Sequence, residues 1–140
     1  MVILDTDVLS ALMLSEPDEA VASWLDRQAR TSVWTTSVTI FEIRFGLEVM
    51  PTGRRCAGLE MGFARLLKDK LEDRVLVFDE AAAEAAAALT GRRHRAGRPR
   101  ELRDSMIAGI ALAQRATLAT RNVRRFDDLR VSVVDPWHNR

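Results

Sequence analysis

The sequence predicts a three-layer α/β domain, with helices on both faces of a mostly parallel sheet of four or five strands. Short apolar or β-branched runs alternate along the chain with segments of helical periodicity, which is typical of a parallel sheet with crossover helices. The chain has 140 residues, the size of one ordinary domain, and no linker-like segment divides it. Its apolar fraction of 47% and charged fraction of 29% are ordinary for a folded chain. We therefore expect residues 1–140 to form a single domain.

Apolar spacing and turn residues define the elements of the first half. The unbroken run Val2-Ile3-Leu4 predicts a buried strand, and a β-branched and aromatic run predicts the next strand. Thr39 and Glu42 match a capping box in the helix that follows, and Pro51 breaks that helix. In order, we expect a strand at 2–4, helices at 9–13 and 19–30, a strand at 33–36, a helix from 37 or 39 to 50, and a helix at 54–71.

The second half continues the same alternation. Asp79 is a suitable N-cap for an alanine-rich helix, because its carboxylate can accept hydrogen bonds from the first backbone N–H groups. The expected elements are a strand at 75–78, a helix at 79–93, a basic loop to residue 100, a helix from 101 or 103 to 114, a strand at 117–120, a loop with one helical turn at 121–125, and a strand at 131–134.

Charge is distributed unevenly along the chain. Residues 1–90 carry nine basic and fifteen acidic side chains, and residues 91–140 carry twelve and five, so the halves have net charges of −6 and +7. Nineteen of the 21 basic residues are arginines, which can bind phosphate bidentately. The densest run, at 91–100, is expected to be an exposed loop that either contacts a nucleic-acid backbone or is simply solvated. Its basic residues are Arg92, Arg93, Arg95, Arg98 and Arg100.

Several classes of protein are excluded by composition. Cys56 is the only cysteine, so an internal disulfide is impossible, which fits a reducing cytoplasm. The longest uncharged stretches, 31–41 and 105–114, are too short to span a membrane. Asp5 and Asp7 interrupt the N-terminal segment where a signal peptide would be apolar. We therefore expect a cytoplasmic protein with no membrane association.

Acidic side chains are predicted to meet at the carboxyl edge of the sheet, where parallel sheets bind their ligands. Asp5 directly follows the first strand, Glu42 lies beside the apolar face of its helix, and Asp104 lies at the start of a helix. Asn122 follows the strand at 117–120 and can offer an amide oxygen. Alternative interpretations are structural: Asp7 could cap the first helix, Glu42 could complete its capping box, and an acid in the first turn of a helix is favoured by the macrodipole.

Three carboxylates without a counter-charge are expected to repel one another unless a divalent cation joins them. Oxygen ligands suit Mg²⁺ or Mn²⁺. His94 and His138 are isolated, no cysteine–histidine cluster exists, and no glycine-rich phosphate loop is present in the sequence. The chemistry indicated is attack on phosphorus by a metal-activated water, with Asp5, Glu42 and Asp104 as metal ligands.

Four segments resemble the sequence blocks of the PIN-domain ribonucleases, in particular the VapC toxins of bacterial toxin–antitoxin pairs. The first contains Asp5-Thr6-Asp7, the second contains Glu42, the third contains Asp104, and the fourth contains Asn122. The blocks span residues 2–10, 36–46, 103–111 and 118–126. The closing Val134-Asp135-Pro136-Trp137 resembles the FitB-type subgroup. The resemblance covers nearly the whole chain.

This resemblance implies a PIN-like fold and a metal-dependent endoribonuclease toxin that uses Mg²⁺ or Mn²⁺. Asp5, Glu42 and Asp104 would be its site acids, and Asn122 would position water or phosphate. It also implies an RNA substrate, a cognate antitoxin, a homodimer that can assemble further with the antitoxin, and operator DNA bound through the antitoxin. Many relatives carry a fourth acid at the position of Asn122 or Arg125; neither is acidic in this chain, which argues against a second metal ion.

Two other functions remain open at this point. A PIN-like module could bind RNA or a partner without cleaving it, and the missing fourth acid favours that hypothesis. Asp5-Thr6-Asp7 also resembles the D-x-D motif of haloacid-dehalogenase-type phosphatases. That family needs a lysine on a later element, and Lys68 and Lys70 lie in a charged helical stretch that suits it poorly.

The predicted homodimer needs an apolar surface beyond the core. We expect it on two helices, because their apolar residues exceed what a small sheet can cover. The candidates are Val21, Trp24 and Leu25 on one helix and Phe45, Leu47, Val49 and Met50 on the other.

Overall fold

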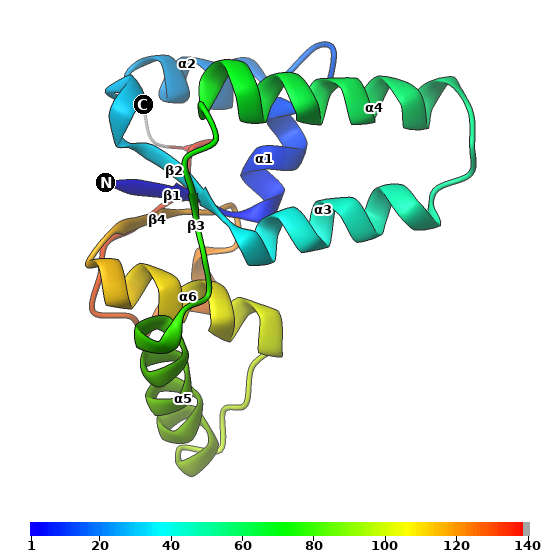
Figure 1. Cartoon of the computed structure of the whole chain (residues 1–140). Coiled ribbons are helices and arrows are strands. Elements are labelled where there is room, and N and C mark those ends of the chain that lie inside the picture. The colour runs from blue at the N-terminus through cyan, green and yellow to red at the C-terminus, as the bar shows by residue number, and fades with distance from the viewer. Residues whose placement is uncertain (139–140) are drawn as a thin grey trace.

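The computed structural model describes residues 1–138, which form a three-layer α/β domain (Figure 1). Five strands make one sheet in the order β3-β2-β1-β4-β5, and every neighbouring pair is parallel. This confirms the predicted fold class. The strands are β1 (Val2–Leu4), β2 (Val33–Thr36), β3 (Val75–Leu76), β4 (Thr117–Ala119) and β5 (Val133–Val134).

Six α-helices cover the two faces of the sheet in the part of the chain that the structure describes. Figure 1 shows α1 to α4 on one side of the sheet and α5 and α6 on the other. The helices are α1 (Thr6–Leu12), α2 (Glu19–Asp26), α3 (Ser37–Val49), α4 (Arg54–Arg65), α5 (Glu80–Arg95) and α6 (Leu102–Gln114). None of the helices within residues 1–138 is long and apolar enough to cross a bilayer.

The central strand β1 is buried on both faces because helices lie against each. Val2 and Leu4 belong to the core shared with α1 to α4, whereas Ile3 belongs to the core shared with α5 and α6. This alternation is what a strand imposes, since successive side chains point to opposite faces. An uninterrupted apolar run is therefore required at β1, and Val2-Ile3-Leu4 supplies it.

Register places the ends of the central strands together. Val2 pairs with Val33 of β2 and with Thr117 of β4, and Leu4 pairs with Ala119. All three strands run in the same direction, so the residues that follow them emerge at one carboxyl edge of the sheet. The register thereby sets the position of the candidate site.

Helix caps differ in part from the sequence predictions. Asp79 caps α5 as predicted, and its carboxylate accepts a hydrogen bond from Ala82 N over 2.9 Å. The capping box of Thr39 and Glu42 is wrong: Thr36 is the N-cap of α3, and its hydroxyl accepts from Thr39 N over 3.0 Å. Because the helix begins earlier than a Thr39 cap requires, the Glu42 carboxylate is free to interact with other elements.

The basic segment at 91–100 is not a loop along its whole length, which corrects the prediction. Helix α5 continues to Arg95, because alanine and arginine both favour helix and no proline interrupts them. Gly97, with φ of 69°, then takes the left-handed conformation that ends the helix. Three of the five arginines of this segment are therefore helical.

The apolar surface predicted for dimerisation is only partly exposed. Val21, Trp24 and Leu47 are 0%, 3% and 6% exposed and belong to the core, so their assignment to an interface is wrong. Phe45 and Val49 of α3 are exposed, and the Phe45 ring stacks on Phe41 with centroids 6.2 Å apart. Of the residues predicted for the interface, the exposed ones therefore lie in a stripe along α3.

The α5–α6 packing generates a prediction about stability. A Cβ at Gly109 would lie 2.5 Å from Ala82 O and 2.6 Å from Ala86 Cβ, so the two helices cross too closely for any larger residue. We expect Gly109→Ala to lower the free energy of unfolding by about 1–3 kcal/mol in urea denaturation. Gly58→Ala is the matched control, because a Cβ there meets nothing within 4 Å; it should stabilise the protein by about 0.5–1 kcal/mol. Equal effects of the two changes would contradict this account.

Candidate active site

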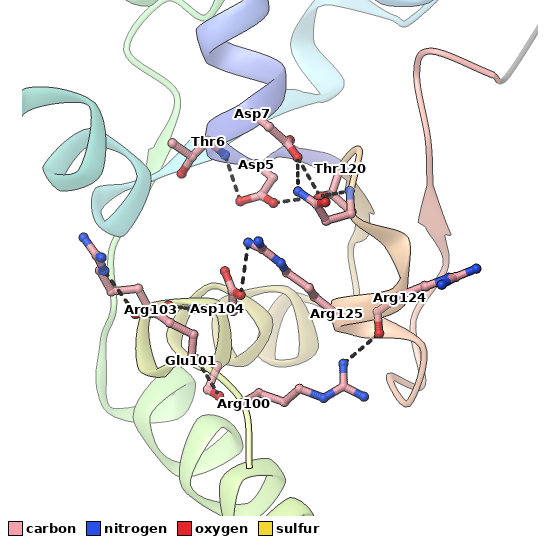
Figure 2. Close-up of polar contacts among 12 residues, drawn as sticks. Asp5, Thr6, Asp7, Arg100, Glu101, Arg103, Asp104, Thr120, Arg124 and Arg125 are labelled. Carbon is pink, nitrogen blue, oxygen red and sulfur yellow. Dashed lines mark hydrogen bonds and ion pairs between the residues drawn. The ribbon is translucent and has the colours of Figure 1, made fainter. Parts of the chain in front are cut away.

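The predicted acids come together at the carboxyl edge of the sheet. Asp5 follows β1, Glu42 lies on α3, and Asp104 lies in the first turn of α6. Figure 2 shows Asp5 and Asp104 directed toward the same space between α1 and α6. The charge of Asp104 raises the pKa of Asp5, and the charge of Glu42 raises the pKa of Asp104, so the three acids share one electrostatic environment.

Asp5 is both a helix cap and the most buried acid of the site. Its Oδ1 accepts from Thr6 N and its Oδ2 accepts from the Thr120 hydroxyl, each over 2.8 Å. Burial, followed by the charges of Asp7 and Asp104, raises its pKa to about 7, although the hydrogen bonds from Thr120 and Thr6 oppose the rise. Without a cation, the Asp5 carboxyl therefore retains a proton close to neutral pH.

Asp7 does not cap α1, contrary to the alternative interpretation of the sequence, because Asp5 takes that position. Asp7 Oδ2 instead accepts from Arg121 N over 3.1 Å and from Asn122 Nδ2 over 3.0 Å. Its Oδ1 is buried and has no hydrogen-bond partner within residues 1–138, and burial raises the pKa of Asp7. Asp7 is thus a further acid of this edge, and the Asn122 amide N–H is used to hold it.

Glu42 and Asp104 have counter-charges, which corrects the prediction of an uncompensated cluster. Arg103 Nε lies 3.7 Å from Glu42 Oε2, and Arg125 Nη1 lies 3.5 Å from Asp104 Oδ2. The Thr6 hydroxyl also donates to Glu42 Oε1 over 2.8 Å. Burial raises the pKa of Asp104, and the Arg125 charge opposes that rise. Both arginines are exposed enough for these ion pairs to be weak and easily exchanged.

The donor chemistry of this edge fits a hard divalent cation. Each acid of this edge has carboxylate oxygens, which are the ligands that Mg²⁺ and Mn²⁺ prefer. The buried Asp7 Oδ1 is an acceptor without a hydrogen-bond partner among residues 1–138. In the conformation described for residues 1–138, however, no three acidic, histidine or cysteine side chains are arranged to share one ion. A cation would therefore have to draw Asp5, Glu42 and Asp104 together and displace the two arginines.

Arg93 is the main correction to the predicted phosphate-binding arginines. It is only 3% exposed, and its Nε and Nη2 each donate to a carboxylate oxygen of Asp128 over 2.8 Å. This pairing holds the pKa of Asp128 below its usual value. The Arg93 guanidinium also donates to Ser105 Oγ and to the Arg125 carbonyl oxygen, each over 3.2 Å. Arg93 is therefore a structural residue that joins α5, α6 and the 3₁₀ turn η3 (Val123–Phe126).

The other arginines of the basic segment differ in how much they are engaged. Arg92, Arg95 and Arg98 are exposed at the end of α5 and in the loop after it. Arg100 is half-buried and donates to the Arg124 carbonyl oxygen over 2.7 Å. Three of the predicted set are thus free to meet a ligand.

Four residues of this edge were not predicted from the sequence. Thr120 follows β4 as Asp5 follows β1, so its position was an available signal. Thr6 and Arg103 are adjacent to predicted acids, but their side-chain direction depends on the tertiary packing. Arg125 lies in η3, far along the chain from Asp104, and no local pattern indicated their pairing.

The family model of the PIN domain matches residues 2–131. The chain is 34% identical over 137 residues to VapC ribonuclease Y4jK of Sinorhizobium fredii, covering 98% of each chain. It is 30% identical over 139 residues to Toxin FitB of Neisseria gonorrhoeae, covering 99% of this chain and all of the relative. The solved structure of FitAB bound to an IR36 DNA fragment superposes with a TM-score of 0.87 at 29% identity, covering 100% of this chain and 98% of the other.

The raised pKa of Asp5 generates a prediction about pH. A carboxyl with a pKa near 3.8 when unfolded and about 7 when folded binds its proton more tightly in the folded state. Its contribution to stability is therefore lost as the pH rises between those values. In EDTA, we expect the wild type to melt at a lower temperature at about pH 8 than at about pH 5. Asp5→Asn should remove most of this difference, because the amide does not titrate. The variant should remain folded, since the amide oxygen can still cap α1.

The matched control is Asp26→Asn, at an exposed position outside the site. It should keep the wild-type difference in melting temperature between the two pH values. A pH dependence that is unchanged by Asp5→Asn would show that Asp5 titrates alike in the folded and unfolded states.

Arg93 generates a second prediction, which separates a structural role from RNA binding. We expect Arg93→Met to lower the free energy of unfolding by about 1–3 kcal/mol, because it removes the hydrogen bonds of the buried guanidinium to Asp128, Ser105 and the Arg125 carbonyl oxygen. The neighbouring Arg92→Met removes the same charge at an exposed position and should change stability by less than about 0.5 kcal/mol. Equal stability of the two variants in urea denaturation would restore Arg93 to the candidate RNA contacts.

Proposed function

The chain belongs to the PIN-domain family, and from this premise we propose that it is a metal-dependent endoribonuclease, the toxin of a toxin–antitoxin pair. The observation that carries the proposal is the gathering of Asp5, Glu42 and Asp104 at the carboxyl edge of the sheet, with Asp5 buried and its pKa raised. Burying an acid costs free energy unless hydrogen bonds, a counter-charge or a cation compensate it, and carboxyls with strongly raised pKa values are common at functional sites. Similarity to a VapC ribonuclease and to Toxin FitB supports this choice of chemistry.

Asp5, Glu42 and Asp104 would hold Mg²⁺ or Mn²⁺. Such an ion supplies a bound water of lowered pKa and offsets charge on the phosphodiester. Asp5 would lose its proton to solvent on binding the ion, and Arg103 would release Glu42. Asn122 would keep Asp7 in place through its amide N–H and help to position water or phosphate. In the reaction, the water oxygen bonds to phosphorus, one ester P–O bond breaks, and the leaving oxygen takes up a proton.

Exposed arginines would supply affinity for the RNA backbone. Arg92, Arg95 and Arg98 are exposed, whereas Arg100 would first have to leave its contact with the Arg124 carbonyl oxygen. Neutralising phosphates releases counterions, so replacing these residues should weaken RNA binding and reduce its salt dependence without changing the chemical step. Arg93 would contribute only through the packing described above.

We also propose a cognate antitoxin and a homodimer as partners. The FitAB structure holds a DNA fragment, which supports operator binding by a complex of this chain with its antitoxin rather than by this chain alone. For the dimer, the exposed α3 stripe of Phe41, Phe45 and Val49 replaces the surface predicted from sequence. Light scattering of the isolated chain at micromolar concentration tests the dimer.

A non-catalytic PIN-like module is the second candidate. Its support is the pairing of Glu42 with Arg103 and of Asp104 with Arg125, together with the absence of a three-ligand cluster within residues 1–138. The haloacid-dehalogenase alternative loses support, because both lysines of the chain precede β3 and lie at the amino end of that strand.

Cleavage of total RNA in Mg²⁺ or Mn²⁺ tests the proposed function. We expect the wild type to cleave, and Asp5→Ala and Asp104→Ala to reduce the rate by about 100-fold or more, because each removes a ligand of the ion. Glu42→Gln should also impair cleavage. Glu48→Gln is its matched control on the exposed face of the same helix, and should cleave at the wild-type rate.

Two outcomes would contradict this assignment. Equal cleavage by the wild type and Asp5→Ala would place the chemistry elsewhere, and cleavage that survives EDTA would exclude a metal-dependent mechanism. RNA binding without cleavage by the wild type would favour the non-catalytic module.

A further inference from the structure

The side chain of Arg125 points into the acidic site although its backbone lies outside it. Its guanidinium Nη1 lies 3.5 Å from Asp104 Oδ2. Figure 2 shows Arg125 directed toward Asp104, whereas Arg124, the preceding residue of the same turn, points away from the site. The Arg125 side chain is 58% exposed, so a ligand can reach it, while the Asp104 side chain is 10% exposed.

Stability does not account for this placement. An ion pair in which one partner is this exposed contributes at most about 1 kcal/mol. The turn that carries Arg125 is fixed by other contacts: Phe126 is 1% exposed in the core, and the buried Arg93 donates to the Arg125 carbonyl oxygen over 3.2 Å. The backbone of Arg125 is therefore held firmly, and only its side chain is free to exchange partners.

An RNA backbone can approach this acidic edge only if a positively charged side chain there binds its phosphates. Asp5, Asp7, Glu42 and Asp104 would repel an RNA backbone that approaches them. Arg103 is shared between two carboxylates, because its Nε lies 3.7 Å from Glu42 and 3.3 Å from Glu101. Arg125 faces one carboxylate and has five N–H donors arranged in a planar fork that fits the oxygens of a phosphate.

From these observations, which rest on the proposed ribonuclease function, we propose that Arg125 is a catalytic residue that binds the phosphate being cleaved. In the free chain its guanidinium pairs with Asp104. When RNA and a metal ion are bound, the guanidinium transfers to a non-bridging phosphate oxygen and Asp104 turns to the ion. Placed there, Arg125 stabilises the negative charge that accumulates on phosphorus-bound oxygens as water adds.

Steady-state cleavage of a short RNA at saturating Mn²⁺ tests this role. We expect Arg125→Met, which keeps the aliphatic stem, to lower kcat by about 100-fold, and Arg125→Lys, which keeps the charge but loses the fork, to lower it by about tenfold. Arg124→Met is the matched control, with the same change of charge one residue away, and should leave kcat within about twofold of wild type. Urea denaturation should show all three folded, with stability changes below about 1 kcal/mol.

Two binding measurements provide readouts other than activity. By calorimetry without RNA, Arg125→Met should bind Mn²⁺ about two- to fivefold more tightly than wild type, because Asp104 loses a competing cation, whereas Arg124→Met should not. By fluorescence anisotropy, a slowly cleaved phosphorothioate RNA should bind more weakly to Arg125→Met than to Arg124→Met.

A kcat of Arg125→Met equal to that of the wild type would overturn the proposal. A higher kcat would also overturn it, because it would show that the pairing of Arg125 with Asp104 inhibits cleavage. Equal binding of the phosphorothioate RNA by Arg125→Met and Arg124→Met would also overturn it. If the wild type binds this RNA but cleaves none, the ribonuclease function fails, and the two binding measurements still decide whether Arg125 holds a phosphate at this site.

Discussion

The pairing of β1 with a parallel strand on each side is the constraint on which the site depends. The hydrogen-bond ladder continues one residue past β1, because Asp5 N donates to Ala119 O over 2.9 Å. The position of the Asp5 carboxylate is therefore set by the sheet and not by a flexible loop. Its burial and its raised pKa follow directly, and the hydroxyl of Thr120 and the backbone of Thr6 are the groups that make this burial tolerable.

Arginine has two different physical roles around this edge. Arg93 is buried, paired bidentately and shared among three elements, so it behaves as part of the core. Arg103 and Arg125 keep much of their side chains in solvent and pair at longer distances, so they can release their carboxylates at little cost. Burial thus separates chemically identical side chains: Arg93 supports the structure of the site, whereas Arg103 and Arg125 remain available to bind a ligand.

The buried acids of this edge lower the stability of the fold at neutral pH and at the same time provide ligands for a cation. Asp5, Asp7 and Asp104 all have raised pKa values, with burial as the largest cause in each case. Repulsion among the acids is a smaller contribution than the sequence suggested, because arginines from α6 and η3 reach Glu42 and Asp104. A fold that concentrates acids at one sheet edge in this way is less stable at neutral pH and better prepared to receive a cation.

The fold class, most of the elements and the location of the three acids were predictable from the sequence, because each depends on local patterning. An apolar run followed by Asp5 indicates a buried strand and its end, and parallel strands share one edge whatever the remaining packing. The partners of those acids were decided only by the tertiary structure. Thr6 meets Glu42 across 36 residues of chain, and Arg93 meets Asp128 across 35. Asp5 caps α1 in addition to its predicted place in the site, because the cap depends on which residue begins the helix. Arg93 is buried because Asp128 and Ser105 pack against it from distant parts of the chain. Local periodicity carries no information about such contacts, since they form only when distant elements pack together.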